Sequence, residues 1–540
     1  MNRFRLPILP LLVLTGVIVA VSWAARSSVS RAIPTNLPRE MSLGNAIAEV
    51  DRKFDEEWSK FDLEPSALAD DLTVFRRLSL ALHGTIPSLE EIRRFESDDK
   101  PDRLTRWTLN RLRDRRFADY FAERLARSFV GTEDGQFVLY RRDRFVNWLS
   151  QRLRENEPYN EIVKRLIATD GLWTGDPATN FLTAAFSNDE FDEEKLASRT
   201  VRAFLGQSMD CAQCHDHPFD KWTQPQFQGL ASFYGHTQLQ FDGVRDFGFV
   251  DGEPLEYMIE DRETLEQKTI SPAVPFGEEW LPAKGSRRDR LAAWITHAEN
   301  RRFERAIVNR VWGLLFGRPL VQPVDDMPDP SDEPDLLDIL GRDFREHNYD
   351  LRRLILTITS SKPFRLASTH SETEARRFWT HEEHSAVFPV TRLRPEQVIG
   401  SMLQAASVKT IDQQSNLLVR TVRFFREQDF VRDFGDAEGD ELAERAGTVS
   451  QTLLRMNGNL PHELTKATPL SSVGRIAHSA GTNEECLDVL FLVCLTRRPT
   501  EAERTAMLAQ LEGQYGNNRA RAVEDLAWAL LNCEEFSWNH

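Results

Sequence analysis

The segment Cys211-Ala212-Gln213-Cys214-His215 is where residue types and spacing point to a specific chemistry. Cys-x-x-Cys-His is the attachment signature of c-type haem. Two thiols at this spacing can reach the two vinyl groups on one porphyrin edge, and the next residue offers an imidazole to the iron. The sequence therefore predicts haem c bonded to Cys211 and Cys214, with His215 as the proximal iron ligand.

The second axial ligand of such an iron must come from outside this segment. His217 follows His215 by two residues, which span about 7 Å when extended. So short a stretch cannot pass around the porphyrin to its other face. The nearest downstream candidates are His236 and Met258. The other arrangement is a five-coordinate iron that is open to a small molecule.

Two interpretations without haem stay open. In the first, thiol, imidazole and carboxylate groups bind a simple metal ion. Its ligands would be Cys211, Cys214, His215 and His217, assisted by Asp216 or Asp220. Ligands this close together are cramped for zinc, whose second ligand pair usually comes from farther along the chain. In the second, Cys211 and Cys214 form a disulfide in an oxidising compartment.

The N-terminus indicates export. Arg3 and Arg5 precede an uncharged apolar run from Leu6 to Ala25, which is typical of a signal peptide. The run is also long enough to span a bilayer as an uncleaved anchor. Residues 1–25 are therefore predicted to be a signal peptide or a membrane anchor, and residues 26–44 a linker. We expect a protein that is periplasmic, or anchored in the membrane and facing the periplasm, and that contacts the membrane through this segment alone. Haem attachment takes place in that compartment.

The remainder predicts a mainly α fold of two helical domains. At 540 residues the chain is too long for one ordinary hydrophobic core. Helical periodicity dominates residues 45–240 and 286–540. In residues 241–285 this period fades while Gly and Pro increase, so we expect an irregular connection with minor β structure. The motif belongs to the first domain.

Local signals fix some helix ends. Val74, Leu78 and Leu82 form an apolar face that Gly84 can end. Ser88 and Glu91 have the spacing of a capping box that opens the next helix.

Charge and the other cysteines exclude some classes of protein. The formal net charge of −16, with both signs mixed along the chain, argues against nucleic-acid binding. The Arg-rich stretch 111–116 is interpreted as part of a solvated helix face. Cys486, Cys494 and Cys533 lie in apolar helical segments and are expected to be buried hydrophobic residues rather than disulfide partners.

Three further clusters have less specific chemistry. His381 and His384 flank two glutamates, one residue short of the zincin spacing, and are interpreted as an exposed charged turn. The loop 323–334 is acidic and rich in proline; its carboxylates could bind calcium, although a solvated loop is the simpler expectation. Asn309 and Arg310 interrupt an apolar helix and are interpreted as a polar pair that bridges helices.

Several stretches resemble one known family. The most specific are Phe204-Leu205-Gly206, the run from Cys211 through His217 to Asp220, and Arg305–Gly317 with its Val-Asn-Arg-Val-Trp core. Together they resemble the planctomycete cytochrome c-like domain family of exported proteins, with the partner domain that follows it. The resemblance implies that Cys211, Cys214 and His215 are the haem site, with His217 and Asp220 as neighbours, and leaves the biochemical activity unassigned.

Two functions follow as hypotheses. The first is a c-type haem protein of the cell envelope that works in electron transfer or small-molecule redox chemistry with a redox partner there. The second is a non-haem structural or binding protein, in which a metal ion or a disulfide stabilises the motif and polysaccharide is a candidate partner.

Overall fold

A computed structural model describes most of the chain after the linker. The described residues are 33, 43–132, 140–187, 190–250, 253–260, 265–372, 374–407, 409–411, 442, 448–469, 471–513 and 518–540. The predicted signal or anchor, 1–25, and most of the linker, 26–44, lie outside them. Among the helices of the described residues, none has the length and apolar character needed to cross a bilayer.

The predicted mainly α fold is confirmed, and strands occur in the described residues as two-stranded antiparallel pairs. Helices lead up to the motif and follow it. They are α2 (Gly44–Lys60), α3 (Asp71–His83), α4 (Leu89–Glu96), α5 (Arg103–Leu112), α6 (Arg115–Val130), α7 (Arg142–Glu155), α8 (Tyr159–Ala168), α9 (Asn180–Thr183), α10 (Glu193–Leu205) and α11 (Gln224–Ala231).

The β structure expected in residues 241–285 is present, although it begins before them. The pairs are β1 (Phe186–Ser187) with β2 (Glu190–Phe191), β3 (Thr237–Gln240) with β4 (Gly243–Asp246), β5 (Phe249–Val250) with β6 (Glu253–Pro254), and β7 (Met258–Glu260) with β8 (Gln267–Thr269).

Helices then resume, and one further strand pair joins distant parts of the chain. The elements are α12 (Arg287–Ile295), α13 (Arg301–Phe316), α14 (Leu336–Glu346), α15 (Leu351–Ser360), α16 (Lys362–Arg365), α17 (Ala375–Glu383), β9 (Thr391–Arg392), α18 (Pro395–Ala406), α20 (Val449–Asn457), α21 (Asn459–Leu464), α22 (Ser472–Ser479), α23 (Asn483–Leu495), α24 (Glu501–Gly513), α25 (Arg519–Asn532) and β10 (Trp538–Asn539), which pairs with β9.

The local signals read from the sequence are confirmed. Gly84 ends α3 in the left-handed conformation, with φ of 67°. Ser88 and Glu91 form the capping box of α4: each side chain accepts a hydrogen bond from the backbone N–H of the other residue.

Helix α13 lies at the centre of the larger hydrophobic core. Every residue from Arg302 to Phe316 is buried, and the helix packs against α3, α10, α14 and α15. This core joins apolar residues from Leu43 to Phe388 and Leu442, whereas a second core joins residues 393–536 with Leu80 of α3 and with Ile86, which follows that helix. Helices from both sides of the irregular segment thus share one core. The predicted domain boundaries stay a prediction.

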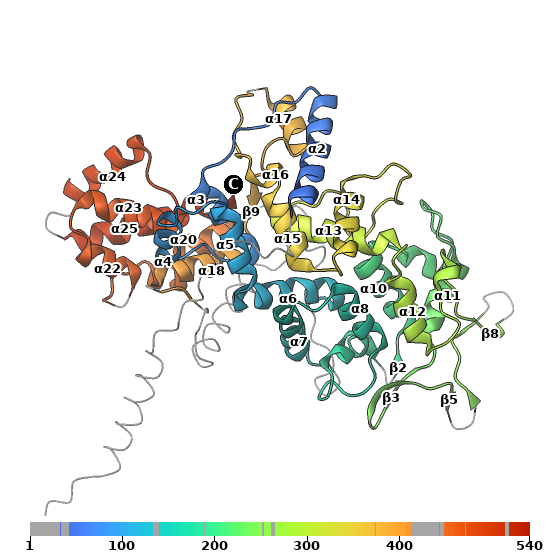
Figure 1. The fold of residues 1–540 in the computed structure, drawn as a ribbon. Coiled ribbons are helices and arrows are strands. Elements are labelled where there is room, and N and C mark those ends of the chain that lie inside the picture. Colours follow the sequence, from blue (N-terminus) through green and yellow to red (C-terminus); the bar gives the residue numbers. More distant parts are fainter. Residues whose placement is uncertain are drawn as a thin grey trace, which may run out of the picture.

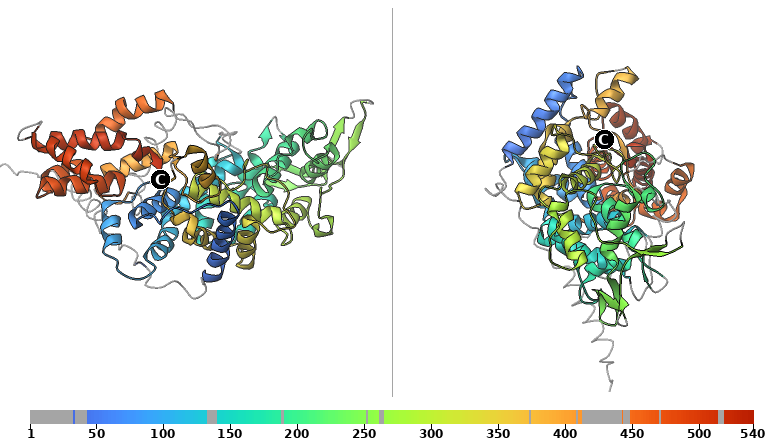
Figure 2. Two further views of the ribbon diagram at one scale, coloured as in Figure 1. Left: turned by 90° about the horizontal axis from the view of Figure 1, so that it is seen from above. Right: turned by 90° about the vertical axis from the view of Figure 1, so that its right-hand side faces the viewer.

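The elements spread along one long axis (Figures 1 and 2). Helices α22–α25 form one end, α10–α12 and the strands β3–β8 form the other, and α3, α5 and α13 lie between them. The chain returns to the middle at its last residues, where β10 pairs with β9 and Arg77 Nε donates a hydrogen bond to the His540 carbonyl oxygen at 2.7 Å. The motif lies toward the α10–α11 end.

Two arginines of the Arg-rich stretch are buried, contrary to the solvated face that we expected. Arg111 and Arg116 are 2% and 6% exposed. Arg116 Nη2 donates to the buried Glu91 carboxylate at 2.7 Å, and Arg111 stacks on the Phe75 ring with 4.2 Å from Cζ to the centroid. A carboxylate partner and an aromatic face make burial of these guanidinium groups tolerable, and neither is visible in the local sequence.

Candidate functional site

The motif forms a short turn between two helices. Helix α10 ends at Gly206, whose φ of 61° turns the chain, and a 3₁₀ turn follows at Asp210–Gln213. Ala212 is fully buried in the core, which anchors the middle of the motif. Because its central residue points inward, both cysteines of the motif face solvent.

Cys211 and Cys214 are exposed, free thiols in this structure, so the disulfide interpretation is not realised in it. His215 is also exposed. Its Nδ1 lies 2.7 Å from the backbone carbonyl oxygen of Asp216. A carbonyl can only accept, so Nδ1 carries the proton and the lone pair is on Nε2. Histidine ligands of metals are usually held in this way, with the second ring nitrogen donating to a carbonyl.

The neighbouring polar groups serve the backbone of their own loop. His217 Nδ1 accepts from the Phe219 N–H at 3.3 Å, and Asp220 Oδ1 accepts from the Lys221 N–H at 2.6 Å. Asp216 Oδ1 accepts from the Gln224 N–H at 2.9 Å. Over the part of the chain that the structure describes, no group of three or more His, Cys, Asp and Glu residues is placed to hold a metal ion.

The two candidate distal ligands lie in and next to the β structure that follows the motif: His236 immediately before β3 and Met258 on β7. His236 Nε2 is 3.5 Å from Glu256 Oε1, and because a carboxylate can only accept, it is the Nε2 proton that faces this partner. Met258 is 55% exposed on β7, opposite Thr269. The structure records no contact between either of them and His215.

Glu194 supports the motif from the first turn of α10. Its carboxylate accepts hydrogen bonds from Gln213 Nε2, inside the motif, and from the Tyr257 hydroxyl at 2.7 Å. The adjacent Glu193 is half-buried, and its burial, together with the negative charges of Asp192, Glu190 and Glu194, raises its pKa to about 7. A concentration of carboxylates therefore lies beside the motif.

The acidic loop 323–334 is not simply solvated, contrary to our expectation, because it contacts the motif segment. Asp329 forms ion pairs with Lys221 and with Arg302 of α13. Asp325 Oδ2 lies 3.7 Å from Arg202 Nε, and Arg202 also pairs with Asp210 at the start of the 3₁₀ turn.

The backbone of this loop is held as well. Ser208 N–H donates to Asp326 Oδ1 at 3.3 Å, and Met327 N–H donates to the Gly206 carbonyl at 2.8 Å. No sequence signal indicated this pairing, because the two segments are separated by about a hundred residues and each looks like an ordinary polar loop.

The Trp222 ring packs against the two cations of these ion pairs, Lys221 and Arg302. It is 2% exposed, and its ring lies 5.6 Å from Arg302 Cζ and 4.9 Å from Lys221 Nζ. Burial lowers the pKa of Arg302 to about 10, which is high enough for the guanidinium to remain charged at neutral pH. The cation–π contacts and Asp329 together balance this partly buried charge.

The other clusters from the sequence have structural roles. His381 is 2% exposed and its Nδ1 donates to the Arg377 carbonyl at 2.7 Å, while His384 stacks on Phe61. The interpretation as an exposed turn was therefore wrong for both. Asn309 exchanges two hydrogen bonds with the backbone of Val321, so it ties α13 to the loop that follows it, whereas the prediction for the pair with Arg310 was a bridge to another helix.

The structure is a mainly helical chain with an exposed Cys-x-x-Cys-His turn. Two family models match it, one on each side of the irregular segment. Residues 49–239 match the PSCyt2 family model, described as a protein of unknown function (DUF1549), and residues 287–511 match the PSD1 model, also a protein of unknown function (DUF1553). The order of the two matches is that of the two-domain planctomycete family that the motifs resemble. No curated protein and no solved structure matches the chain.

Proposed function

We propose that this protein is a c-type haem protein of the cell envelope, with the porphyrin bonded to Cys211 and Cys214 and its iron bound by His215. The observation that carries the proposal is the hydrogen bond from His215 Nδ1–H to the Asp216 carbonyl, at 2.7 Å. It orients the imidazole with the Nε2 lone pair outward. The two thiols beside it are exposed and free, as attachment requires.

The residues of the motif are placed so that haem could be attached at the protein surface. A bound haem supplies a one-electron redox centre. The chain supplies a fixed turn: Ala212 is buried, Gln213 is held by Glu194, and the acidic loop 323–334 is paired to the following segment. The porphyrin edge would be open to solvent, which suits electron exchange with a redox partner better than enclosure of a substrate. We propose that export through residues 1–25 brings the chain to that partner.

Haem attachment is tested by expressing the full chain in a host with haem-maturation machinery and staining a denaturing gel for haem peroxidase activity. We expect a stained band at full length that is lost in the Cys211→Ser/Cys214→Ser variant. Cys533→Ser, which removes a cysteine outside the motif, should keep the stain. Efficient export without stain would refute the proposal.

A second function is favoured by the ion pairs that tie the motif segment to the acidic loop 323–334. In this alternative the motif segment is a structural clasp between the parts of the chain matched by the two families, in a non-haem envelope protein. Here Cys211→Ser would lower stability without any change in the visible spectrum. The same expression experiment separates the alternatives, because only the first produces a covalent chromophore.

A further inference from the structure

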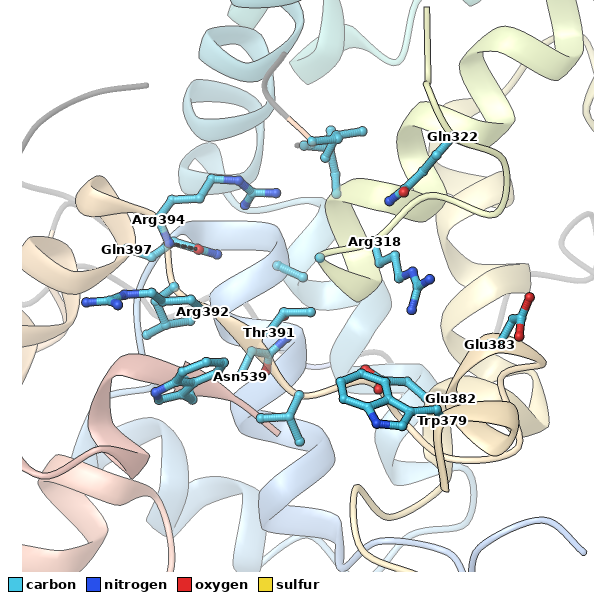
Figure 3. Close-up of a pocket in the computed structure, with 17 residues that line it drawn as sticks. Arg318, Gln322, Trp379, Glu382, Glu383, Thr391, Arg392, Arg394, Gln397 and Asn539 are labelled. Carbon is cyan, nitrogen blue, oxygen red and sulfur yellow. Dashed lines mark hydrogen bonds between the residues drawn. The ribbon is translucent and has the colours of Figure 1, made fainter. Parts of the chain in front are cut away.

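A pocket of about 300 Å³ lies at the middle of the molecule, far along the chain from the motif. Its walls come from the end of α13, from α17, from the start of α18 and from the paired strands β9 and β10 (Figure 3). The pocket thus lies where the two hydrophobic cores meet. Its volume is at the small end of the range for ligand sites and suits one or two small rings.

Two guanidinium groups line this space and have no carboxylate partner among the described residues. Arg394 is 6% exposed and donates one side-chain hydrogen bond, from Nη1 to the Tyr120 hydroxyl at 3.0 Å. Arg318 is exposed and forms no ion pair within the described residues. Figure 3 shows the two side chains on opposite sides of the pocket. A buried guanidinium without a counter-ion is costly, so the arrangement favours an anionic occupant.

The carboxylates of the pocket do not cancel this charge. Glu382 and Glu383 lie on α17, on the side that carries Trp379, against three lining arginines. The Glu383 carboxylate lies at the outer edge of the pocket in Figure 3. Three arginines and two glutamates give the lining a formal net charge of +1.

Two indole rings line the same pocket. Trp379 is 65% exposed on α17, and Trp538 lies in β10. A tryptophan with this much apolar surface in water is a frequent feature of binding sites, because its flat face can cover the C–H face of a ring. The rings provide an apolar surface next to the charged one.

Amide groups complete the lining. Asn539 is 7% exposed, and its Oδ1 is buried without a hydrogen-bond partner among the described residues. Gln322 lies on the Arg318 side of the pocket with its amide group available to solvent.

We propose that this pocket binds a sugar unit that carries a carboxylate or a sulfate ester. The anionic group would bind Arg318, with Arg394 adding positive charge from the opposite wall, the apolar face of the ring would pack on Trp379, and a hydroxyl would bind the Gln322 amide. The combination of cations without a carboxylate partner among the described residues, an exposed indole and an exposed amide fits an acidic sugar better than a neutral sugar or a bare anion. The proposal is independent of haem attachment.

The test is titration calorimetry of the full chain with D-galacturonic acid and D-galactose 6-sulfate, and with D-galactose and inorganic sulfate as comparisons. We expect at least one acidic sugar to bind at least tenfold more tightly than D-galactose and than inorganic sulfate. Arg318→Gln and Trp379→Ala each change an exposed side chain, so the fold should persist, and each should weaken binding about tenfold. Arg475→Gln and Phe241→Ala, at exposed positions elsewhere, are the matched controls and should bind normally.

Each other outcome has a definite meaning. Equal affinity for D-galactose would overturn the anionic part of the proposal, and equal affinity for inorganic sulfate would overturn the sugar part. Absence of binding by both acidic sugars, or normal binding by Arg318→Gln, would overturn it altogether. Thermal melting of every variant separates loss of binding from loss of fold.

Discussion

Both ring nitrogens of His83 face groups of Arg111. Nδ1 lies 3.1 Å from Arg111 Nη1, which can only donate, and Nε2 lies 3.2 Å from the Arg111 carbonyl oxygen, which can only accept. The imidazole is therefore neutral, with its proton on Nε2. Burial, and then the charges of Arg116 and Arg111, lower the pKa of His83 to about 3, although Asp114 and Glu91 act in the opposite sense.

This low pKa predicts that the protein loses stability at pH values well above those at which ordinary carboxylates titrate. Below pH 6.5 the unfolded chain binds a proton at His83 and the native state does not, so stability falls as the pH decreases toward 3. We expect His83 alone to contribute a loss of about 2 kcal/mol between pH 7 and pH 5. His83→Gln should be correspondingly less sensitive to pH than the unaltered protein in urea unfolding.

The control for this measurement is His478→Gln, at an exposed position on α22. It should leave the pH dependence of the unfolding free energy unchanged. An equal pH dependence in His83→Gln and the unaltered protein would contradict the assigned tautomer and charge state.

Glu193 predicts the opposite dependence on pH. Its raised pKa, near 7, means that the native state retains a proton between pH 4.5 and 7 that the unfolded chain releases. Its contribution to stability therefore falls as the pH rises through this range. Glu193→Gln removes the buried charge and should raise stability at pH 8 by about 1–3 kcal/mol, with little effect at pH 4.

Chemical unfolding at both pH values measures this effect. The matched variant is Glu501→Gln, whose side chain is 92% exposed and should give no gain at either pH. A Glu193→Gln variant less stable than the unaltered protein at pH 8 would show that its charge is compensated in the native state.

Asp329 is the predicted anchor of the motif segment on the acidic loop 323–334. Asp329→Asn removes the anion shared by Lys221 and Arg302 and leaves the partly buried Arg302 guanidinium without it. We expect a loss of about 1–3 kcal/mol in the free energy of unfolding, together with faster hydrogen exchange at residues 214–222.

Asp332→Asn is the matched control, because Asp332 is an exposed aspartate of the same loop. It should change neither stability nor exchange. Hydrogen exchange at 214–222 that is insensitive to Asp329→Asn would mean that the loop does not hold the motif segment.

Gly206 is the turn that leads into the motif. At its φ of 61° a Cβ atom would lie 2.6 Å from Met327 Cε and 3.3 Å from the Val324 carbonyl oxygen. The methionine end can move, so the backbone conformation dominates the cost, and Gly206→Ala should lower stability by about 1–2 kcal/mol. Thermal unfolding measures this. Gly44→Ala, where nothing lies within 4 Å, should not destabilise the protein.

Much of the local structure of this protein follows from its sequence. The period of Val74, Leu78 and Leu82, the stop at Gly84 and the capping box of Ser88 and Glu91 depend on residues within a few positions of one another. The Cys-x-x-Cys-His motif is equally local, since its chemistry depends on spacing alone. For the same reason the burial of Cys486 and Cys494 could be predicted from the apolar helix that carries them.

Only the tertiary structure decided which charges are buried and which distant segments meet. Arg111 can be buried because its guanidinium stacks on Phe75 and lies close to the Glu91 carboxylate, both from other helices. Asp329 pairs with Lys221 because α13 brings the acidic loop beside the motif. Contacts of this kind join residues separated by tens to hundreds of positions. The pocket of Arg318, Trp379 and Asn539 arises in the same way, from elements that no short sequence pattern connects.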